Sequence, residues 1–305
     1  MVVVRAAKRV WAWFFEERNC IFQVFYLTLL TISYGVLVTE AWGSLGLGDQ
    51  IIAAFFALSC AGLFFRVSLA DPGVITLANI RDQQVYADHD ALYPRGRVCR
   101  TCKTIKIPRS KHCRVCDHCV ARFDHHCIWV NTCIAKHNYN AFFCFLVTNV
   151  CGSAHLVYIL CAYFIHKMTA KIANAHDLSR DFASQVLTEI ISSPEHARVA
   201  FVASLSIGVW FLVSLLLGCQ MGRVVRNCTA NEHFKRQRLR KDHAEDDPAP
   251  KRPVALDMAW GGVGLVDEVA AQALSVDDIE RNPYDKGVMY NMRDAFDLGA
   301  KDKSS

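Results

Sequence analysis

Seven of the fourteen cysteines of this chain fall between Cys99 and Cys133, and several histidines lie among them. Pairs spaced Cys-x-x-Cys are how a short loop presents two thiolates to one tetrahedral metal ion. A loop with few large aliphatic side chains cannot build its own core and needs cross-links. Reduced thiols in a basic loop favour a cytosolic metal site over disulfides. The candidate ligands are Cys99, Cys102, Cys113, Cys116, Cys119, Cys127, Cys133, His112, His118, His125, His126 and His137.

One of these residues has chemistry beyond metal binding. Two zinc sites need eight ligands, whereas the seven cysteines together with only two of the five histidines already make nine. Cys127 ends the run Asp124-His125-His126-Cys127, where a carboxylate, an imidazole and a thiol lie within four residues. These groups are the parts of an activated sulfur nucleophile. Spacing alone also allows Cys127 to be another ligand, so both interpretations stay open at this point.

The spacing C-x2-C-x9-HC-x2-C-x2-C-x4-DHHC-x5-C-x4-N-x3-F, from Cys99 to Phe142, resembles the cysteine-rich domain of the DHHC family of protein S-acyltransferases, or palmitoyltransferases. The resemblance implies an enzyme that takes a long acyl chain from an acyl-CoA, such as palmitoyl-CoA, onto its own cysteine and passes it to a substrate protein. By position, Cys127 is the nucleophile, His125 the base and Asp124 its orienting residue. The family usually has proline after the nucleophile, where this chain has Ile128.

The same resemblance implies two structural zinc ions with interleaved ligands. Such interleaving ties the loop into a compact scaffold and fixes the backbone that carries the first histidine and Cys127. An imidazole beside the thiol lowers its effective pKa or takes its proton. One zinc ion is assigned to Cys99, Cys102, His112 and Cys119, and the other to Cys113, Cys116, His126 and Cys133.

Four apolar stretches around this loop predict membrane spans, at residues 21–42, 51–69, 142–165 and 199–219. The first covers roughly 33 Å at about 1.5 Å per residue, which is enough to cross a bilayer and too long for a cleaved signal peptide. Lys and Arg counts place both termini and the cysteine-rich loop in the cytosol. We therefore expect an all-α integral membrane protein with four transmembrane helices and a zinc-stapled cysteine-rich cytosolic domain, residues 71–141, between helices 2 and 3.

The segments outside these regions are residues 1–20, 166–198 and 220–305, expected to be a cytosolic N-terminal segment, a lumenal loop and a cytosolic tail. Trp11 and Trp13 lie among basic residues near the N-terminus, which suits either a segment at a membrane surface or a short soluble tail. The membrane is expected to be an endomembrane, of the endoplasmic reticulum or Golgi, or the plasma membrane.

The cysteine-rich loop is strongly basic. Cytosolic orientation, anionic lipid headgroups and the phosphates of CoA each explain this charge. Nucleic acid is not expected, because the loop lies between membrane spans. The expected partners are membrane lipids, acyl-CoA and substrate proteins with membrane-proximal cysteines. The basic residues are Arg95, Arg97, Arg100, Lys103, Lys106, Arg109, Lys111, Arg114 and Arg122.

Three shorter motifs are also similar to the family. Asp71-Pro72-Gly73 follows the second span, and Thr229-Ala230-Asn231-Glu232 stands where the family has Thr-Thr-x-Glu. The latter also reads as a helix-start box. Asn282 to Gly287, with Asn291, resembles a carboxy-terminal motif whose asparagine helps brace the cytosolic domain against the membrane part. Glu245 to Pro253 is expected to be an acidic linker.

The polar residues Asn149 and His155 lie within the third span and either line an acyl cavity or hydrogen-bond a neighbouring helix. Two other classes of function remain in competition with the enzyme. A catalytically silent zinc-binding scaffold would not need an intact Asp124-His125-His126-Cys127, and a metal or redox sensor would give Cys127 no reason to adjoin Asp124 and His125. Incubation with labelled acyl-CoA discriminates the enzyme from the scaffold.

Overall fold

The computed structural model describes residues 2–15, 17–88, 92–173, 184, 187–188, 193–245 and 282–297. The chain divides into two compact units. The cysteine-rich unit joins residues 1–20, 68–140 and 221–305, and the helical unit joins residues 21–67 and 141–220. Most of the expected acidic linker, beyond Glu245, and the acidic residues Asp177, Asp181 and Glu189 of the expected lumenal loop lie outside the described residues.

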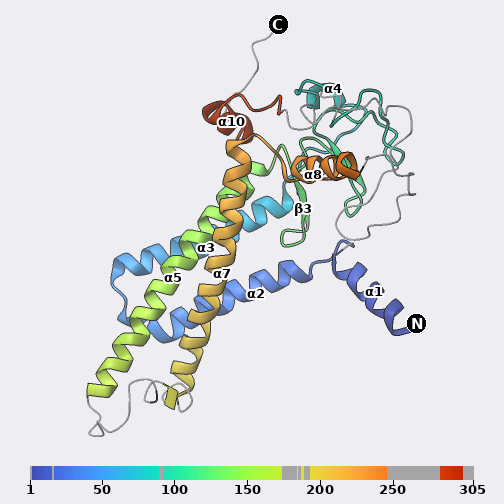
Figure 1. Cartoon of the computed structure of the whole chain (residues 1–305). Coiled ribbons are helices and arrows are strands. Elements are labelled where there is room, and N and C mark those ends of the chain that lie inside the picture. Colours follow the sequence, from blue (N-terminus) through green and yellow to red (C-terminus); the bar gives the residue numbers. More distant parts are fainter. Residues whose placement is uncertain are drawn as a thin grey trace. The chain divides into compact units, whose positions relative to one another are not determined.

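Four helices are long and apolar enough to cross a membrane, at Ile21–Ser44, Leu47–Leu69, Tyr139–Ala170 and Pro194–Val225. The expected helical membrane protein with a cysteine-rich region between helices 2 and 3 is thereby confirmed. In Figure 1 these helices carry the labels α2 (Ile21–Val36), α3 (Leu47–Leu69), α5 (Tyr139–Ala173) and α7 (Pro194–Val225). The first continues from α2 through the π-helical turn η1 (Leu37–Ala41) and the 3-10 turn η2 (Trp42–Ser44).

The core of the helical unit is small and aliphatic. It gathers side chains from the four helices, among them Leu37, Ala53, Leu160 and Val199. Small residues let helix backbones approach closely where the surroundings are as apolar as the core. Large apolar side chains such as Leu58 remain on the outside of the unit, as is typical of residues that face lipid.

Asn149 and His155 of α5 contact neighbouring helices within this unit. The hydroxyl of Tyr26 donates to Oδ1 of Asn149 at 3.0 Å, and Nδ2 of Asn149 donates to the carbonyl of Phe145 at 2.8 Å. His155 lies 3.4 Å from a carboxylate oxygen of Asp49, at the start of α3. Interhelical hydrogen bonds of this kind satisfy polar groups that lipid cannot solvate.

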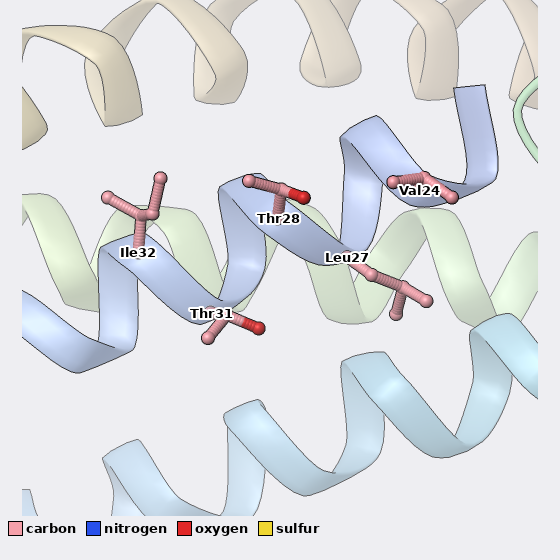
Figure 2. Close-up of a pocket in the computed structure, with 5 residues that line it drawn as sticks. All are labelled: Val24, Leu27, Thr28, Thr31 and Ile32. Atoms are coloured by element: carbon pink, nitrogen blue, oxygen red, sulfur yellow. The ribbon is translucent and has the colours of Figure 1, made fainter. Parts of the chain in front are cut away.

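A surface hollow runs along one side of α2 (Figure 2). It is lined by Val24, Leu27, Thr28, Thr31 and Ile32. These positions recur at three- and four-residue spacing, so they share one side of the helix. All five belong to the helical unit, and the hollow therefore includes none of the candidate catalytic or metal-binding residues.

Two very short hairpins form the centre of the cysteine-rich unit. Strand β1 (Lys111–Cys113) pairs antiparallel with β2 (His118–Val120), and β3 (His125–Cys127) with β4 (Thr132–Ile134). Their turns contain Asp117 and Asn131 at φ +55° and +51°, in the left-handed region that Asp and Asn tolerate better than most residues. Strands of three residues bury little apolar surface, which agrees with the expected need for cross-links.

Four helices complete the described part of the cysteine-rich unit. They are α1 (Val2–Phe15), α4 (Ile80–Gln83), α8 (Ala230–Glu245) and α10 (Val288–Ala295). The last two follow the fourth membrane helix in the sequence, and the N-terminus of α8 takes part in the candidate site.

Candidate active site

The first hairpin brings together one of the two expected ligand sets. His112 of β1 is paired with Cys119 of β2, and the loop before β1 adds Cys99 and Cys102. The Nδ1 atom of His112 lies 3.5, 3.3 and 3.9 Å from the sulfur atoms of Cys99, Cys102 and Cys119, respectively. All four ligand atoms lie within 4.8 Å of one another.

The second hairpin gathers the other expected set in the same way. His126 of β3 is paired with Cys133 of β4. The Nδ1 atom of His126 lies 3.8, 3.3 and 3.9 Å from the sulfur atoms of Cys113, Cys116 and Cys133. The structure therefore groups the same eight residues into the same two sets that the family resemblance implies.

Each cluster can hold one tetrahedral metal ion. Three thiols and an imidazole are a common zinc ligand set, and bonds of about 2.1–2.3 Å place the ligands of a tetrahedron roughly 3.5–3.8 Å apart. The observed sulfur-to-nitrogen distances, 3.3 to 3.9 Å, bracket that spacing. The donor chemistry is consistent with zinc.

Strand β3 divides the Asp124–Cys127 motif between two faces. Successive side chains of a strand point to opposite sides. His126 lies in the second metal cluster, whereas His125 and Cys127, two residues apart, share the other face. The alternation thus separates the histidine of the metal cluster from the histidine beside the thiol.

Hydrogen bonds connect Asp124, His125 and Cys127. The Nδ1 atom of His125 lies 2.8 Å from Oδ2 of Asp124, and a side-chain hydrogen bond links His125 to Cys127. Asp124 and Cys127 are buried, with 3% and 8% of their surfaces exposed, whereas the His125 side chain is 31% exposed. A carboxylate, an imidazole and a thiol linked in this order can orient the histidine and activate the cysteine.

The surroundings favour the charged forms of Asp124 and His125. Burial alone would raise the pKa of Asp124, but hydrogen bonds from His125 and from the Ala230 amide hold that pKa below its ordinary value. Burial likewise disfavours a charged His125, yet its hydrogen bonds to Asp124 and Cys127 outweigh burial and raise its pKa to about 10. Asp124 is therefore ionised at neutral pH, and a proton accepted by His125 is held firmly.

The N-terminus of α8 provides the second partner of Asp124. The backbone N–H of Ala230, the first residue of α8, donates to Oδ1 of Asp124 at 2.5 Å. Thr229 and Glu232 form the expected helix-start box: the Glu232 amide donates to Oγ1 of Thr229 at 3.2 Å, and the Thr229 amide donates to Oε2 of Glu232 at 2.8 Å. Because the donor to Asp124 is the backbone, alanine at position 230 is compatible with this contact.

A buried arginine holds this helix start. The Nε and Nη2 atoms of Arg109 donate to the Glu232 carboxylate at 2.7 and 2.9 Å, and Nη1 donates to Oδ1 of Asn227 at 2.9 Å. The guanidinium also lies over the rings of Tyr86 and Tyr284, 4.8 and 4.3 Å from their centres. A planar fork with several donors suits such a site better than a lysine. Arg109 therefore joins the cysteine-rich loop to the start of α8 and to the C-terminal segment.

Two of the basic residues of the cysteine-rich loop are buried and cannot contact lipid headgroups or CoA at its surface. Arg109 is 0% exposed and Arg122 is 7% exposed, so neither belongs to a basic surface. Arg122 donates to the carbonyl of Ala295 at 3.3 Å and lies 3.5 Å from Asp294. Local sequence gives no sign of this burial, because the carboxylate that pairs with Arg109 is 123 residues away in the chain.

The Asp71-Pro72-Gly73 motif contacts the hairpins of the cysteine-rich unit. The Asp71 carboxylate accepts the N–H groups of Gly73 and Val74, each at 3.0 Å. Gly73 has φ +100°, which favours glycine, and its carbonyl accepts the amide of Ala121 at 3.0 Å. The turn therefore continues into contact with the residue that follows β2.

Three other residues noted in the sequence lie outside the metal clusters. Asn291 of α10 is 0% exposed, and its Nδ2 donates at 2.6 Å to the carbonyl of Val225, the last residue of α7. His137 lies 3.4 Å from the side-chain amide of Gln83. Nε2 of His118 is buried and has no hydrogen-bond partner within the described part of the chain. Neither histidine belongs to a described metal cluster.

Comparison with known families gives one assignment. The family model described as DHHC palmitoyltransferase matches residues 93–237. This range includes both Cys/His clusters, Asp124 to Cys127, Arg109 and the start of α8. A comparison with curated proteins gives no match.

Proposed function

Because the chain carries a DHHC palmitoyltransferase domain and is thereby a member of that family, we propose that it is a protein S-acyltransferase. It takes a long acyl chain from acyl-CoA onto Cys127 and passes the chain to a cysteine of a substrate protein. The observation that carries this proposal is the hydrogen-bonded series Asp124, His125 and Cys127. An ionised carboxylate is unfavourable in a buried place unless it is partnered, and here the partner is a histidine beside a thiol.

In the first step, the proton of the Cys127 thiol is held on His125, in keeping with the raised pKa of the imidazole, and the thiolate of Cys127 attacks the carbonyl carbon of the acyl-CoA thioester. A bond forms between that carbon and the sulfur of Cys127, and the bond to the sulfur of CoA breaks. The leaving CoA thiolate receives the proton from His125. Asp124 stabilises the His125 imidazolium until its proton passes to the leaving CoA thiolate.

The second step repeats the first with a protein thiol as the acceptor. The substrate cysteine gives its proton to His125 and attacks the acyl group on Cys127. The new thioester forms on the substrate as Cys127 leaves, and the proton returns to Cys127. One thioester replaces another in each step, so the enzyme needs no further energy source for the transfer.

The eight clustered residues have a structural role in this proposal. Cys99, Cys102, His112 and Cys119 hold one zinc ion, and Cys113, Cys116, His126 and Cys133 hold the other. When bound, the two ions supply cross-links that fold a loop with little apolar core. His126 then fixes strand β3, on which His125 and Cys127 share one face.

The proposed topology puts the chemistry at the cytosolic face of the membrane. Residues 1–20, 71–141 and 220–305 are cytosolic, residues 166–198 are lumenal, and the spans are residues 21–42, 51–69, 142–165 and 199–219. The acyl chain of the substrate dissolves in the bilayer and presents its thioester at the headgroup level. This arrangement explains why the enzyme is integral to the membrane and why its substrates have membrane-proximal cysteines.

Four variants of the purified full-length protein test these roles. Cys127→Ser should keep two zinc ions and lose the hydroxylamine-sensitive acyl adduct, because a serine hydroxyl is a far weaker nucleophile at neutral pH. Cys133→Ser should lose metal first, because it opens a tetrahedral site. His125→Ala should keep zinc and acylate about 10²- to 10⁴-fold more slowly, as for a lost general base. His126→Ala should behave like Cys133→Ser.

Zinc content and thioester formation are measured on the same four samples. If Cys127→Ser lost zinc, or still formed a hydroxylamine-sensitive adduct, the assignment of Cys127 as the nucleophile would be wrong. If the parent protein with two zinc ions formed no adduct with any long-chain acyl-CoA, the silent scaffold would replace the enzyme as the better proposal.

A further inference from the structure

We infer that α1 (Val2–Phe15) is an in-plane membrane anchor whose ligand is the anionic headgroup layer of the leaflet beside it. This inference goes beyond acyl transfer and rests only on insertion of the four candidate membrane helices. The first of those helices begins at Ile21, and five residues separate it from the end of α1. A segment so close to a span stays near the headgroup level at all times.

The sequence of α1 places its charges on one side of the helix. Successive positions of an α-helix differ by about 100°, and the three basic positions, Arg5, Lys8 and Arg9, occupy a single arc of about 100°. The helix has no acidic residue, and its remaining positions are Val, Ala, Trp or Phe. A broad apolar face beside a narrow basic arc is typical of helices that lie in a membrane interface.

Four large apolar side chains of α1 are exposed to a considerable extent within the described part of the cysteine-rich unit. Val4, Val10, Trp11 and Trp13 remain 59%, 55%, 51% and 44% exposed. Tryptophan is enriched at membrane interfaces because its apolar body and polar N–H suit the boundary between lipid and water. The chain connects this exposed apolar face directly to the first span, so the bilayer is an apolar environment within its reach.

The end of α1 is defined by a side-chain cap. Nδ2 of Asn19 donates to the carbonyl of Trp13 at 2.7 Å and to that of Phe14 at 3.2 Å. These carbonyls are among those that the last turn of a helix leaves without partners. The cap therefore ends α1 before the membrane span begins, and the two segments do not form one continuous helix.

The positive charge of the basic arc indicates that anionic lipid is the partner of α1. A basic arc without acidic residues is complementary to a leaflet that contains phosphatidylserine or phosphoinositides. Each basic residue near such a surface strengthens attachment about fivefold. In a single leaflet, the acyl chains can cover the apolar face of α1 while the headgroups contact its basic arc, because an interfacial helix presents one side to each.

Collision measurements on the full-length protein in vesicles test the inference. A nitroxide-bearing unnatural residue is placed at Val10 or at Ala12, two positions that are about 200° apart around the helix. Oxygen reports contact with the bilayer interior, and a water-soluble nickel chelate reports contact with water. The vesicles contain phosphatidylcholine alone or with phosphatidylserine, and acyl-Cys127 formation is measured in the same samples.

The expected result is a several-fold higher ratio of oxygen to nickel collisions at Val10 than at Ala12, increased by phosphatidylserine and reduced by Arg9→Ala. Equal exposure of both positions to nickel in both lipids would mean a soluble tail. Protection of Val10 from both reagents would mean a protein contact. Either outcome overturns the anchor, and if acyl-Cys127 still forms, the proposed enzyme is unaffected. An immersed Val10 without acyl-Cys127 would leave the anchor standing while the proposed function fails.

Discussion

Replacement of Arg109 by alanine should destabilise the cysteine-rich unit strongly. Arg109 and Glu232 are both 0% exposed, and two hydrogen bonds of 2.7 and 2.9 Å join them. Removal of one partner from a buried ion pair leaves an uncompensated charge and costs about 3–5 kcal/mol. We expect Arg109→Ala to fall in this range, because the hydrogen-bond donors that Glu232 keeps among the described residues, the Tyr93 hydroxyl and the Thr229 amide, are neutral.

Two further variants separate charge from shape at this site. Arg109→Lys keeps the positive charge but cannot reach Glu232 and Asn227 with one planar fork, so its loss should be smaller than that of alanine. The double variant Arg109→Met with Glu232→Met removes both charges of the buried pair, and Asp294, which lies 3.6 Å from Arg109, keeps Arg122 at 3.5 Å. Well-packed apolar replacements of buried pairs are often close to neutral, so the double variant should be more stable than Arg109→Ala despite its additional substitution.

The assay is denaturant-induced zinc release from the purified full-length protein, followed with a chromogenic chelator. Release reports unfolding of the cysteine-rich unit, because the metal ligands are part of it. The rate of acyl-Cys127 formation is measured in parallel, since Glu232 belongs to the helix start whose first amide contacts Asp124. A destabilisation by Arg109→Ala of less than about 1 kcal/mol, the range of exposed pairs, would refute the reasoning.

Four other predictions concern the metal clusters, the helix start, acid stability and topology. Elemental analysis should find two zinc ions per chain, and fewer in Cys116→Ala, because metal-ligand bonds stabilise the folded loop. Ala230→Pro puts a residue suited to the first helical position at the start of α8 but removes the N–H that contacts Asp124. Acylation of Cys127 should slow at least about tenfold, as for a lost hydrogen bond to a charged group. The control variant Ala230→Thr keeps the N–H and should retain the rate. Burial opposes ionisation of Glu232, but Arg109 outweighs burial and lowers the pKa of Glu232 below its ordinary value. The ionised Glu232 therefore stabilises the folded cysteine-rich unit above about pH 4.5, and this stabilisation is lost as the pH falls further. The denaturant concentration at the midpoint of zinc release should accordingly fall less steeply with decreasing pH in Glu232→Gln than in the parent protein. An N-glycosylation site engineered beside Arg95 should stay unmodified in cells, and its modification would contradict a cytosolic loop.

The membrane helices and the metal clusters follow from local features of the sequence. Apolar runs long enough to cross a bilayer need no tertiary partner to be recognised. Cysteine and histidine pairs at short spacing predict ligands because chain connectivity alone keeps them close. The helix-start box at Thr229 and Glu232 is local in the same sense, since both partners lie within one turn of α8.

Long-range polar contacts could not be predicted in this way. The burial of Arg109 depends on Glu232, Asn227 and Tyr284, which are brought to it only when the C-terminal segment contacts the hairpins. A count of charges treats such an arginine and a solvated lysine alike, because composition contains no information on burial. The contact of the Ala230 amide with Asp124 has no side-chain signature at all. The sequence by itself therefore determined the spans, the ligand types and the candidate thiol. Only the tertiary structure decided which charges are buried and which backbone group contacts Asp124, because those contacts join segments that are more than one hundred residues apart in the chain.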